Sequence, residues 1–234
     1  MPIREHMSVA DELRDIIIAD IVLILAFSLT LVGGIFGLFS NRGSFISNFL
    51  IVLPVVAVGV TLSFILHELM HKFVAQRYGA IAGFRTNPIF LLITFATGAA
   101  GFLLGMPGAT MIYVQSFTKK ENGIVSLAGP ATNLVIFAIT IAVFYYMGPA
   151  ANSYLANALG FIIFINLFLA FFNMLPIYPL DGSKVIAWNM PIYAAVMGAI
   201  IILLVLFTAI SITYIVYLLV IAIALSFFYR GIFR

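Results

Sequence analysis

The sequence predicts an all-α polytopic membrane protein with about six transmembrane helices and a re-entrant loop or hairpin between the second and third. Hydrophobic residues make up 64% of the 234 residues and charged residues only 8%, against roughly 45–50% and about 25% in soluble domains. A soluble fold needs charged side chains to cover its surface, so this composition excludes one. Several uncharged stretches also reach the ~20 residues that a hydrocarbon core of ~30 Å requires.

The predicted spans are the stretches of the sequence that contain no charged residue. The N-terminal residues carry mixed charge and lead into a long apolar run, unlike the basic start and short apolar stretch of a cleaved signal peptide, so the first span is expected to be kept. The charge count below makes 1–20 an expected N-terminal cytoplasmic segment. Residues 192–229 carry no charge and are too long for one span, which predicts two spans with a turn near 208–213. The other predicted spans are 21–40, 45–66 (within a core helix 45–78), 124–147 and 155–175.

The segment 88–113 is apolar but interrupted by glycine and proline, and charge decides how it is placed. Of the 11 Lys and Arg residues, six spans leave Arg42 alone on one side and the other ten together. A seventh span at 88–113 would move five of them across and give five against six. The positive-inside rule favours ten against one, so 88–113 is predicted to be re-entrant and both termini cytoplasmic. The ten are Arg4, Arg14, Lys72, Arg77, Arg85, Lys119, Lys120, Lys184, Arg230 and Arg234.

The composition also limits the chemistry that the chain can carry. The net charge is +3 and the basic residues are scattered, whereas a nucleic-acid partner would require clustered Lys and Arg. The chain contains no cysteine, which excludes disulfides and thiolate metal ligands. Any bound metal must therefore be held by His, Asp or Glu.

The motif with the strongest chemical content is His67-Glu68-Leu69-Met70-His71. Positions i and i+4 share one face of a helix, so both imidazoles can reach a single zinc ion. Glu68 is placed to act as general base for the attacking water. Because ionisable groups at membrane depth are costly and usually functional, a purely structural role for these three residues is disfavoured.

Asp181 is the candidate third zinc ligand. A catalytic zinc site needs three protein ligands and an open position, and Asp181 follows the predicted fourth span in a stretch containing Pro176, Pro179 and Gly182. By itself this stretch is equally typical of a helix-exit loop whose solvated Asp caps the next helix. With six spans, however, Asp181 and the two His residues both lie at inner ends of spans, on the cytoplasmic side of the bilayer.

Three motifs in this order resemble those of the site-2 protease family of intramembrane zinc metalloproteases: His67–His71, Gly129–Asn133 in the third span, and Asn173–Gly182. The resemblance covers about 62–184 and implies a single transmembrane protease domain at 21–230. It implies one Zn²⁺ per chain held by His67, His71 and Asp181, with Glu68 as the catalytic acid/base. It also implies that Asn173 binds the substrate carbonyl or oxyanion.

The chain departs from the family pattern at three places. Met70 stands where the family often has glycine, Ser183 stands where a second glycine is common, and 88–113 is longer and more apolar than the usual hairpin. The length leaves no room for an appended regulatory domain, so the expected partners are the lipid bilayer and transmembrane protein or peptide substrates. A homo-oligomer has no support in the sequence.

The predicted reaction is hydrolysis of a peptide bond within or beside a substrate's transmembrane helix in the cell membrane. Because a helix hides its carbonyls, the substrate has to unwind, and 88–113 or 176–179 could offer it a strand edge by β-augmentation. One alternative is a metal-ion or proton-coupled transporter that uses the same His and Asp residues. Transporters often contain internal repeats, and neither motif occurs twice here. The other alternative is a catalytically inactive membrane scaffold.

Overall fold

The computed structural model of the chain describes residues 8–103, 107–113, 116–148 and 152–208. Within these residues the fold is mainly helical and contains one two-stranded sheet. The chain forms two compact units, the first from Met1–Glu68 and Ala80–Tyr113 and the second from Leu69–Gly79 and Val114–Arg234. The boundary between them falls inside one long helix, after Glu68.

The first unit begins with helix α1 (Val9–Leu31), whose N-cap Ser8 accepts a hydrogen bond from the Asp11 N–H. A short helix, α2 (Gly34–Ser40), follows after a 43° bend. Gly33 has φ +85°, a left-handed conformation that glycine adopts at little cost. Helix α1 therefore begins at Val9, within the expected N-terminal segment 1–20, and the expected first span 21–40 is divided between α1 and α2 at the glycines.

Helix α3 (Arg42–Arg77) is 36 residues long and contains both the predicted second span and the His67–His71 motif. The predicted core helix 45–78 thus agrees with the structure to within a few residues. Pro54 lies inside α3 and removes one backbone donor without ending the helix.

The segment after α3 forms a hairpin that encloses a helix. Strand β1 (Ile81–Thr86) pairs antiparallel with β2 (Gly108–Tyr113), and α4 (Pro88–Ala99) lies between them in the chain. The expectation of an all-α fold is therefore wrong at this hairpin. With 12 residues, α4 is about 18 Å long at 1.5 Å per residue, too short to cross a ~30 Å core alone.

Acidic side chains of α1 bind the backbone of β1. The Phe84 N–H donates to Glu12 Oε1 at 3.2 Å, and the Thr86 N–H donates to Asp15 Oδ2 at 3.3 Å. Both carboxylates are buried. The charges that suggested an aqueous N-terminal segment therefore accept hydrogen bonds from backbone N–H groups of β1, which are costly to leave unpaired away from water.

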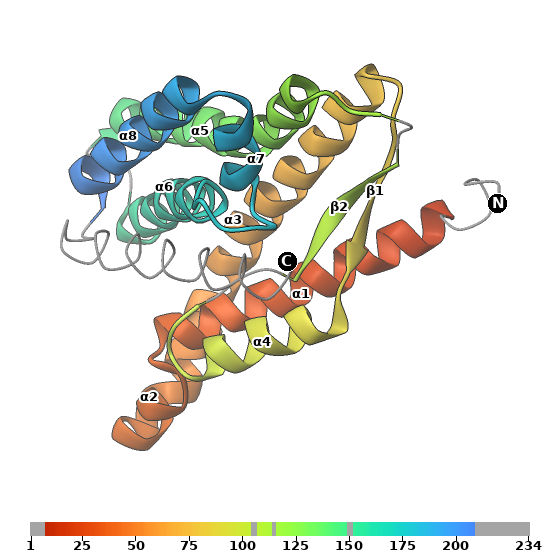
Figure 1. Cartoon of the computed structure of the whole chain (residues 1–234). Coiled ribbons are helices and arrows are strands. Elements are labelled where there is room, and N and C mark those ends of the chain that lie inside the picture. The colour runs from red at the N-terminus through yellow and green to blue at the C-terminus, as the bar shows by residue number, and fades with distance from the viewer. Residues whose placement is uncertain (1–7, 104–106, 114–115, 149–151, 209–234) are drawn as a thin grey trace. The chain divides into compact units, whose positions relative to one another are not determined.

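Helix α1 also packs against α4, and the two run side by side in the first unit (Figure 1). Gly98 of α4 makes this approach close, since a Cβ there would lie 2.6 Å from the Ala26 Cα. Asp20 of α1 is buried and accepts a hydrogen bond from the Thr61 hydroxyl of α3 at 2.6 Å. Its other oxygen, Oδ1, has no hydrogen-bond partner among the described residues.

The second unit contains helices α5 (Lys119–Met147), α6 (Ser153–Asn173), α7 (Asp181–Trp188) and α8 (Met190–Phe207). A capping box between Thr118 and Glu121 sets the start of α5. The predicted spans 124–147 and 155–175 correspond to α5 and α6. Helix α8 ends just before the predicted turn at 208–213, and the last predicted span lies outside the described residues.

Helix α5 packs against both α6 and α7, and α8 packs on α6 and α7 (Figure 1). Asn133 of α5 donates through Nδ2 to Asn166 Oδ1 of α6 at 3.0 Å, and both side chains are fully buried. At the other contact, a Cβ on Gly123 of α5 would lie 2.5 Å from the Trp188 Cβ of α7. Glycine at that position therefore lets the end of α7 lie directly on α5.

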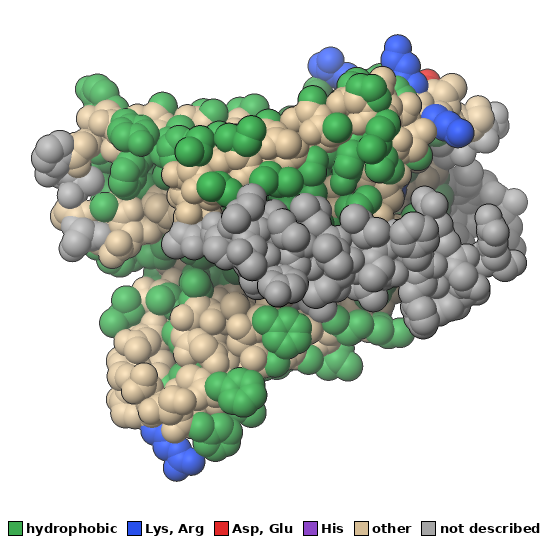
Figure 2. Space-filling view, turned by 60° about the vertical axis from the view of Figure 1, so that its left-hand side comes forward, with side chains coloured by type: hydrophobic (Ala, Val, Ile, Leu, Met, Phe, Trp, Pro, Cys, Tyr) green, Lys and Arg blue, Asp and Glu red, His purple; other side chains and the backbone are tan. Residues whose placement is uncertain are grey.

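In the part of the chain that the structure describes, four helices are long and apolar enough to cross a membrane, or five if α1 and α2 form one bent span. Their outer residues include apolar side chains that are well exposed, such as Val58 at 62% and Leu206 at 68%. In the space-filling view, hydrophobic side chains lie over much of the described surface (Figure 2). A surface of this kind belongs in lipid, and the protein is a multi-pass membrane protein.

Candidate metal centre

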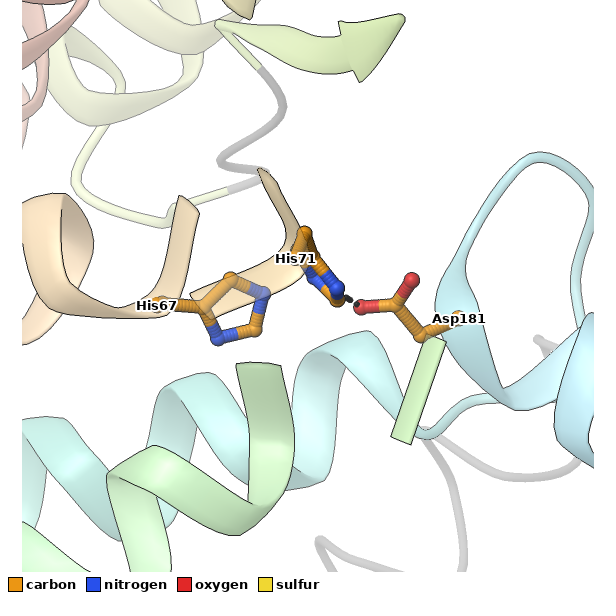
Figure 3. A group of neighbouring side chains, drawn as sticks. All are labelled: His67, His71 and Asp181. Carbon is orange, nitrogen blue, oxygen red and sulfur yellow. Dashed lines mark ion pairs between the residues drawn. The ribbon is translucent and has the colours of Figure 1, made fainter. Parts of the chain in front are cut away.

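The two histidines of the motif project from neighbouring turns of α3, and Asp181 reaches them from the first residue of α7 (Figure 3). The three residues are buried, and one potential ligand atom from each lies within 4.8 Å of the others. The structure therefore brings together the three residues that the sequence predicts as zinc ligands.

The two ring nitrogens of His71 have different partners. Nδ1 lies 2.7 Å from the Val125 carbonyl oxygen of α5. A carbonyl only accepts, so Nδ1 carries the hydrogen and Nε2 is left to bind a cation. A backbone carbonyl that fixes the far nitrogen in this way is typical of histidines that bind metal.

Nε2 of His71 lies 3.1 Å from Asp181 Oδ2. A nitrogen lone pair and a carboxylate oxygen repel at this distance unless a proton or a metal ion lies between them. Two ligands placed 2.0–2.1 Å from a tetrahedral zinc are separated by about 3.3 Å. The spacing and the mixed nitrogen and oxygen donors therefore fit zinc.

The loop before α7 fixes the position of Asp181. Leu180 is extended and forms the N-cap of α7, so Asp181 occupies the first helical turn, where a carboxylate is favourable. A Cβ on Gly182 would clash with the Met174 carbonyl oxygen and lie 2.6 Å from that of Leu175. Glycine is therefore required for the loop to fold back on the end of α6. Lys184, one turn further, places Nζ 3.8 Å from Asp181 Oδ1.

Glu68 is half-buried, and its carboxylate accepts a hydrogen bond from the Thr110 hydroxyl of β2 at 2.7 Å. Thr110 could not be predicted as a partner of Glu68 from the sequence, because it lies 42 residues further along the chain. Asn173 is the last residue of α6, and its Nδ2 donates to the Leu169 carbonyl of the same helix at 3.0 Å.

Val125 and Asn166 were not among the residues that the sequence predicted for the site, and Asn133 was noted only as part of the motif Gly129–Asn133. A backbone acceptor such as Val125 leaves no side-chain signal. Asn166 could have been found from the sequence, because an amide side chain in the middle of an apolar span is costly unless it has a hydrogen-bond partner.

Two histidines and one carboxylate that leave a coordination position open are the donor set of catalytic, not structural, zinc sites. The centre thus places the chain among the membrane metallohydrolases.

The comparisons with known proteins agree with this class. The model of peptidase family M50 matches residues 138–207, a stretch that contains Asp181 but not the histidines. A candidate zinc metalloprotease of Methanocaldococcus jannaschii, MJ0611, is 42% identical over 146 residues, which cover 62% of this chain and 74% of that protein. The chain belongs to peptidase family M50, and the family resemblance inferred from the three motifs is confirmed.

Two further relatives are also named as candidate zinc metalloproteases. YwhC of Bacillus subtilis is 32% identical over 57% of this chain and 68% of its own length. Rip2 of Mycolicibacterium smegmatis is 30% identical over 59% of this chain, and the match spans little more than half of Rip2, 57%. No solved structure matches the chain. Zinc is accordingly the cofactor, and the protein is a zinc metalloprotease.

Proposed function

We propose that the protein is an intramembrane endopeptidase that cuts peptide bonds in or near the transmembrane segments of its substrates. One observation carries the proposal: His67, His71 and Asp181 form a buried group of possible metal ligands, and both histidines belong to α3, a helix apolar enough to cross a membrane. A hydrolytic centre built on such a helix acts on bonds that enter the bilayer or lie at its surface.

The chain's own residues divide the work. His67, His71 and Asp181 hold the zinc, and the Val125 carbonyl orients the His71 ring. When bound, zinc lowers the pKa of water toward ~7 and polarises the scissile carbonyl. Glu68 takes the proton of the attacking water and delivers it to the leaving amine.

Asn173 is the proposed donor to the oxyanion that develops on the scissile carbonyl. An amide N–H in this role strengthens its bond as negative charge develops. In the present structure the Asn173 Nδ2 donates to the Leu169 carbonyl, and because an amide nitrogen carries two hydrogens, the second can be donated to the substrate oxygen. The motif Asn173–Gly182 and the position of Asn173 in the same unit as Asp181 support the role.

The hairpin is the proposed place where an unwound substrate binds as a strand. In an antiparallel pair, residues alternate between exchanging backbone hydrogen bonds with the partner strand and directing them outward. Phe84 and Thr86 of β1 direct their N–H groups outward, to Glu12 and Asp15 of α1. The outer edge of β1 is thus occupied.

The same alternation identifies the backbone groups of β2 that face outward. Thr110 pairs with Phe84 and Gly108 with Thr86, so the N–H and C=O groups of Gly108, Thr110 and Ile112 point away from β1. No described residue forms a backbone bond with them. An added strand would pair there, and the substrate backbone would lie beside the residue that contacts Glu68.

Both termini and the metal centre are proposed to lie on the cytoplasmic side. Six spans give ten basic residues against Arg42 alone, out of 11, in keeping with the positive-inside rule. Reporter tags at either terminus and at Gly123 are expected to be cytoplasmic, and a tag near Ala150 external. A tag at Gly123 found outside would place a span within 88–113 and contradict the arrangement.

The transporter alternative has no support, because the relatives reported above are named as metalloproteases. It also gives Glu68 no task, since Glu68 is not among the grouped ligands.

The test is cleavage of a transmembrane peptide by purified protein, wild type and Glu68→Gln, with and without a zinc chelator. The amide of Gln cannot take the proton, so cleavage falls by about 10²–10⁴-fold while zinc stays bound. Asn173→Ala in the same assay is expected to lower kcat and keep the zinc. Cleavage that survives both Glu68→Gln and the chelator would rule out the proposed mechanism.

A further inference from the structure

The hydroxyl of Thr110 joins strand β2 to the glutamate of the metal-binding motif. Its oxygen lies 2.7 Å from Glu68 Oε2 and 3.5 Å from the Glu68 backbone oxygen. A hydroxyl has a single hydrogen, and the short contact to a carboxylate is the stronger of the two. Both residues belong to the first unit.

We propose that Thr110 is the positioning residue of the general base: its hydrogen bond holds the Glu68 carboxylate in the orientation that receives the proton. The inference rests on the proposed role of Glu68. Thr110 itself touches neither the ligands nor, in this role, the reacting atoms.

A glutamate that acts as general base needs a hydrogen-bond partner that holds its carboxylate in place. A general base must lie within hydrogen-bond reach of the proton that it takes, and a displacement of ~1 Å can cost about 10²-fold in rate. Glu68 is only half-buried, so packing alone leaves its long side chain several rotamers. The bond from Thr110 is made to Oε2, and no described residue forms a hydrogen bond or ion pair with Oε1. Oε1 is therefore the oxygen left to receive the proton.

The hairpin is anchored to α3 at two points one turn apart. Thr110 and Phe84 are cross-strand partners. Phe84 is buried and packs edge-on against the Phe64 ring of α3, with centroids 5.5 Å apart, while Thr110 bonds to Glu68. Phe64 and Glu68 are i and i+4 on α3 and so share a face. The apolar contact fixes the strand, and the polar contact fixes the carboxylate.

The alternative is that the Thr110 side chain contributes only packing to the hairpin. Three variants separate this packing role from the positioning role. Thr110→Val keeps the β-branched shape that a strand favours and removes the hydroxyl. Thr110→Ser keeps the hydroxyl and removes the methyl group. Thr86→Val is the matched control, because Thr86 lies in the same hairpin and its hydroxyl forms no hydrogen bond within the described residues.

The measurements are zinc content, kcat and KM on a transmembrane peptide. Thr110→Val is expected to lower kcat by roughly 10–100-fold, with KM within about twofold and zinc retained. Thr110→Ser and Thr86→Val are expected to stay within about threefold of wild type. Normal kcat in Thr110→Val, an equal loss in Thr110→Ser, a change confined to KM, or loss of zinc would each overturn the positioning role.

A second measurement does not depend on activity. Melting temperatures of the zinc-loaded full chain are compared for wild type, Glu68→Ala, Thr110→Val and the double variant. A direct bond makes the two losses less than additive, and strict additivity would overturn the inference. If wild type cuts nothing, or Glu68→Gln cuts normally, the proposed function fails. If Glu68→Gln is inactive and Thr110→Val is normal, only this inference fails.

Discussion

Asp15 in the first unit and Asp181 in the second are buried to the same degree and each lies near a basic side chain, Arg85 for Asp15 and Lys184 for Asp181, but their other partners differ. Their side chains are 9% and 10% exposed. Asp15 accepts from the Thr86 backbone N–H and lies 3.5 Å from Arg85 Nη1, so its charge is met by donors of the fold itself. Asp181 faces Nε2 of His71, an atom whose lone pair calls for a cation. Burial alone therefore does not mark a functional acid, whereas the nature of its partner does.

Replacing a buried aspartate by asparagine removes its charge at nearly constant shape. The same substitution at Asp181, Asp15 and Asp20 therefore tests which of these carboxylates needs its charge for zinc binding and which for stability. The largest effect is expected for Asp181→Asn. Its neutral amide is a poor zinc ligand, so the protein should lose most of its zinc and its proteolysis while the helical content stays the same. Elemental analysis and circular dichroism of the purified variant measure both. Full zinc occupancy in Asp181→Asn would mean that the third ligand is another residue.

A smaller, purely structural effect is expected for Asp15→Asn. The variant keeps one oxygen for the Thr86 N–H but brings its own amide hydrogens toward Arg85. The free energy of unfolding should fall by about 1–2 kcal/mol, with zinc content unchanged. Thermal melting measures the loss of stability and metal analysis measures the zinc content. A loss of zinc as large as that of Asp181→Asn would show that Asp15 also contributes to the metal centre.

The smallest effect is expected for Asp20→Asn. Within the part of the chain that the structure describes, its Oδ1 has no hydrogen-bond partner and its other oxygen accepts only from the Thr61 hydroxyl. The asparagine oxygen can accept the same bond. Burying a neutral amide also avoids the cost of burying a charge with one donor. Stability should change by less than about 0.5 kcal/mol or rise. A loss comparable to that of Asp15→Asn would show that the Asp20 charge has a further partner.

The metal centre could be predicted from the sequence because its signals are local or rare. The spacing of His67 and His71 defines one helix face, and Asp181 is one of few acids in an apolar chain. Membrane-spanning stretches are equally visible, since a bilayer imposes a minimum length of uncharged chain. For these reasons α3, α5 and α6 were predicted to within a few residues, the start of α5 apart.

The first unit could not be predicted in the same way because its contacts join distant parts of the chain. Glu12 and Asp15 resemble solvated charges until β1 supplies their donors, which lie 72 and 71 residues away. Strand β1 contains Gly83 and Arg85 and has no alternating pattern to mark it. Nothing in the sequence distinguishes Thr110 from the other threonines, because only the strand register brings it next to Glu68.

The close contact between Gly123 and Trp188 has an experimental consequence. Trp188 is the single tryptophan of the chain, so tryptophan emission from the whole protein originates where α7 meets α5. The same short helix begins with Asp181. The protein thus carries its own optical probe at the far end of the helix that begins with the proposed metal ligand Asp181. Fluorescence recorded during zinc removal therefore reports, without any label, whether α7 keeps its place on α5.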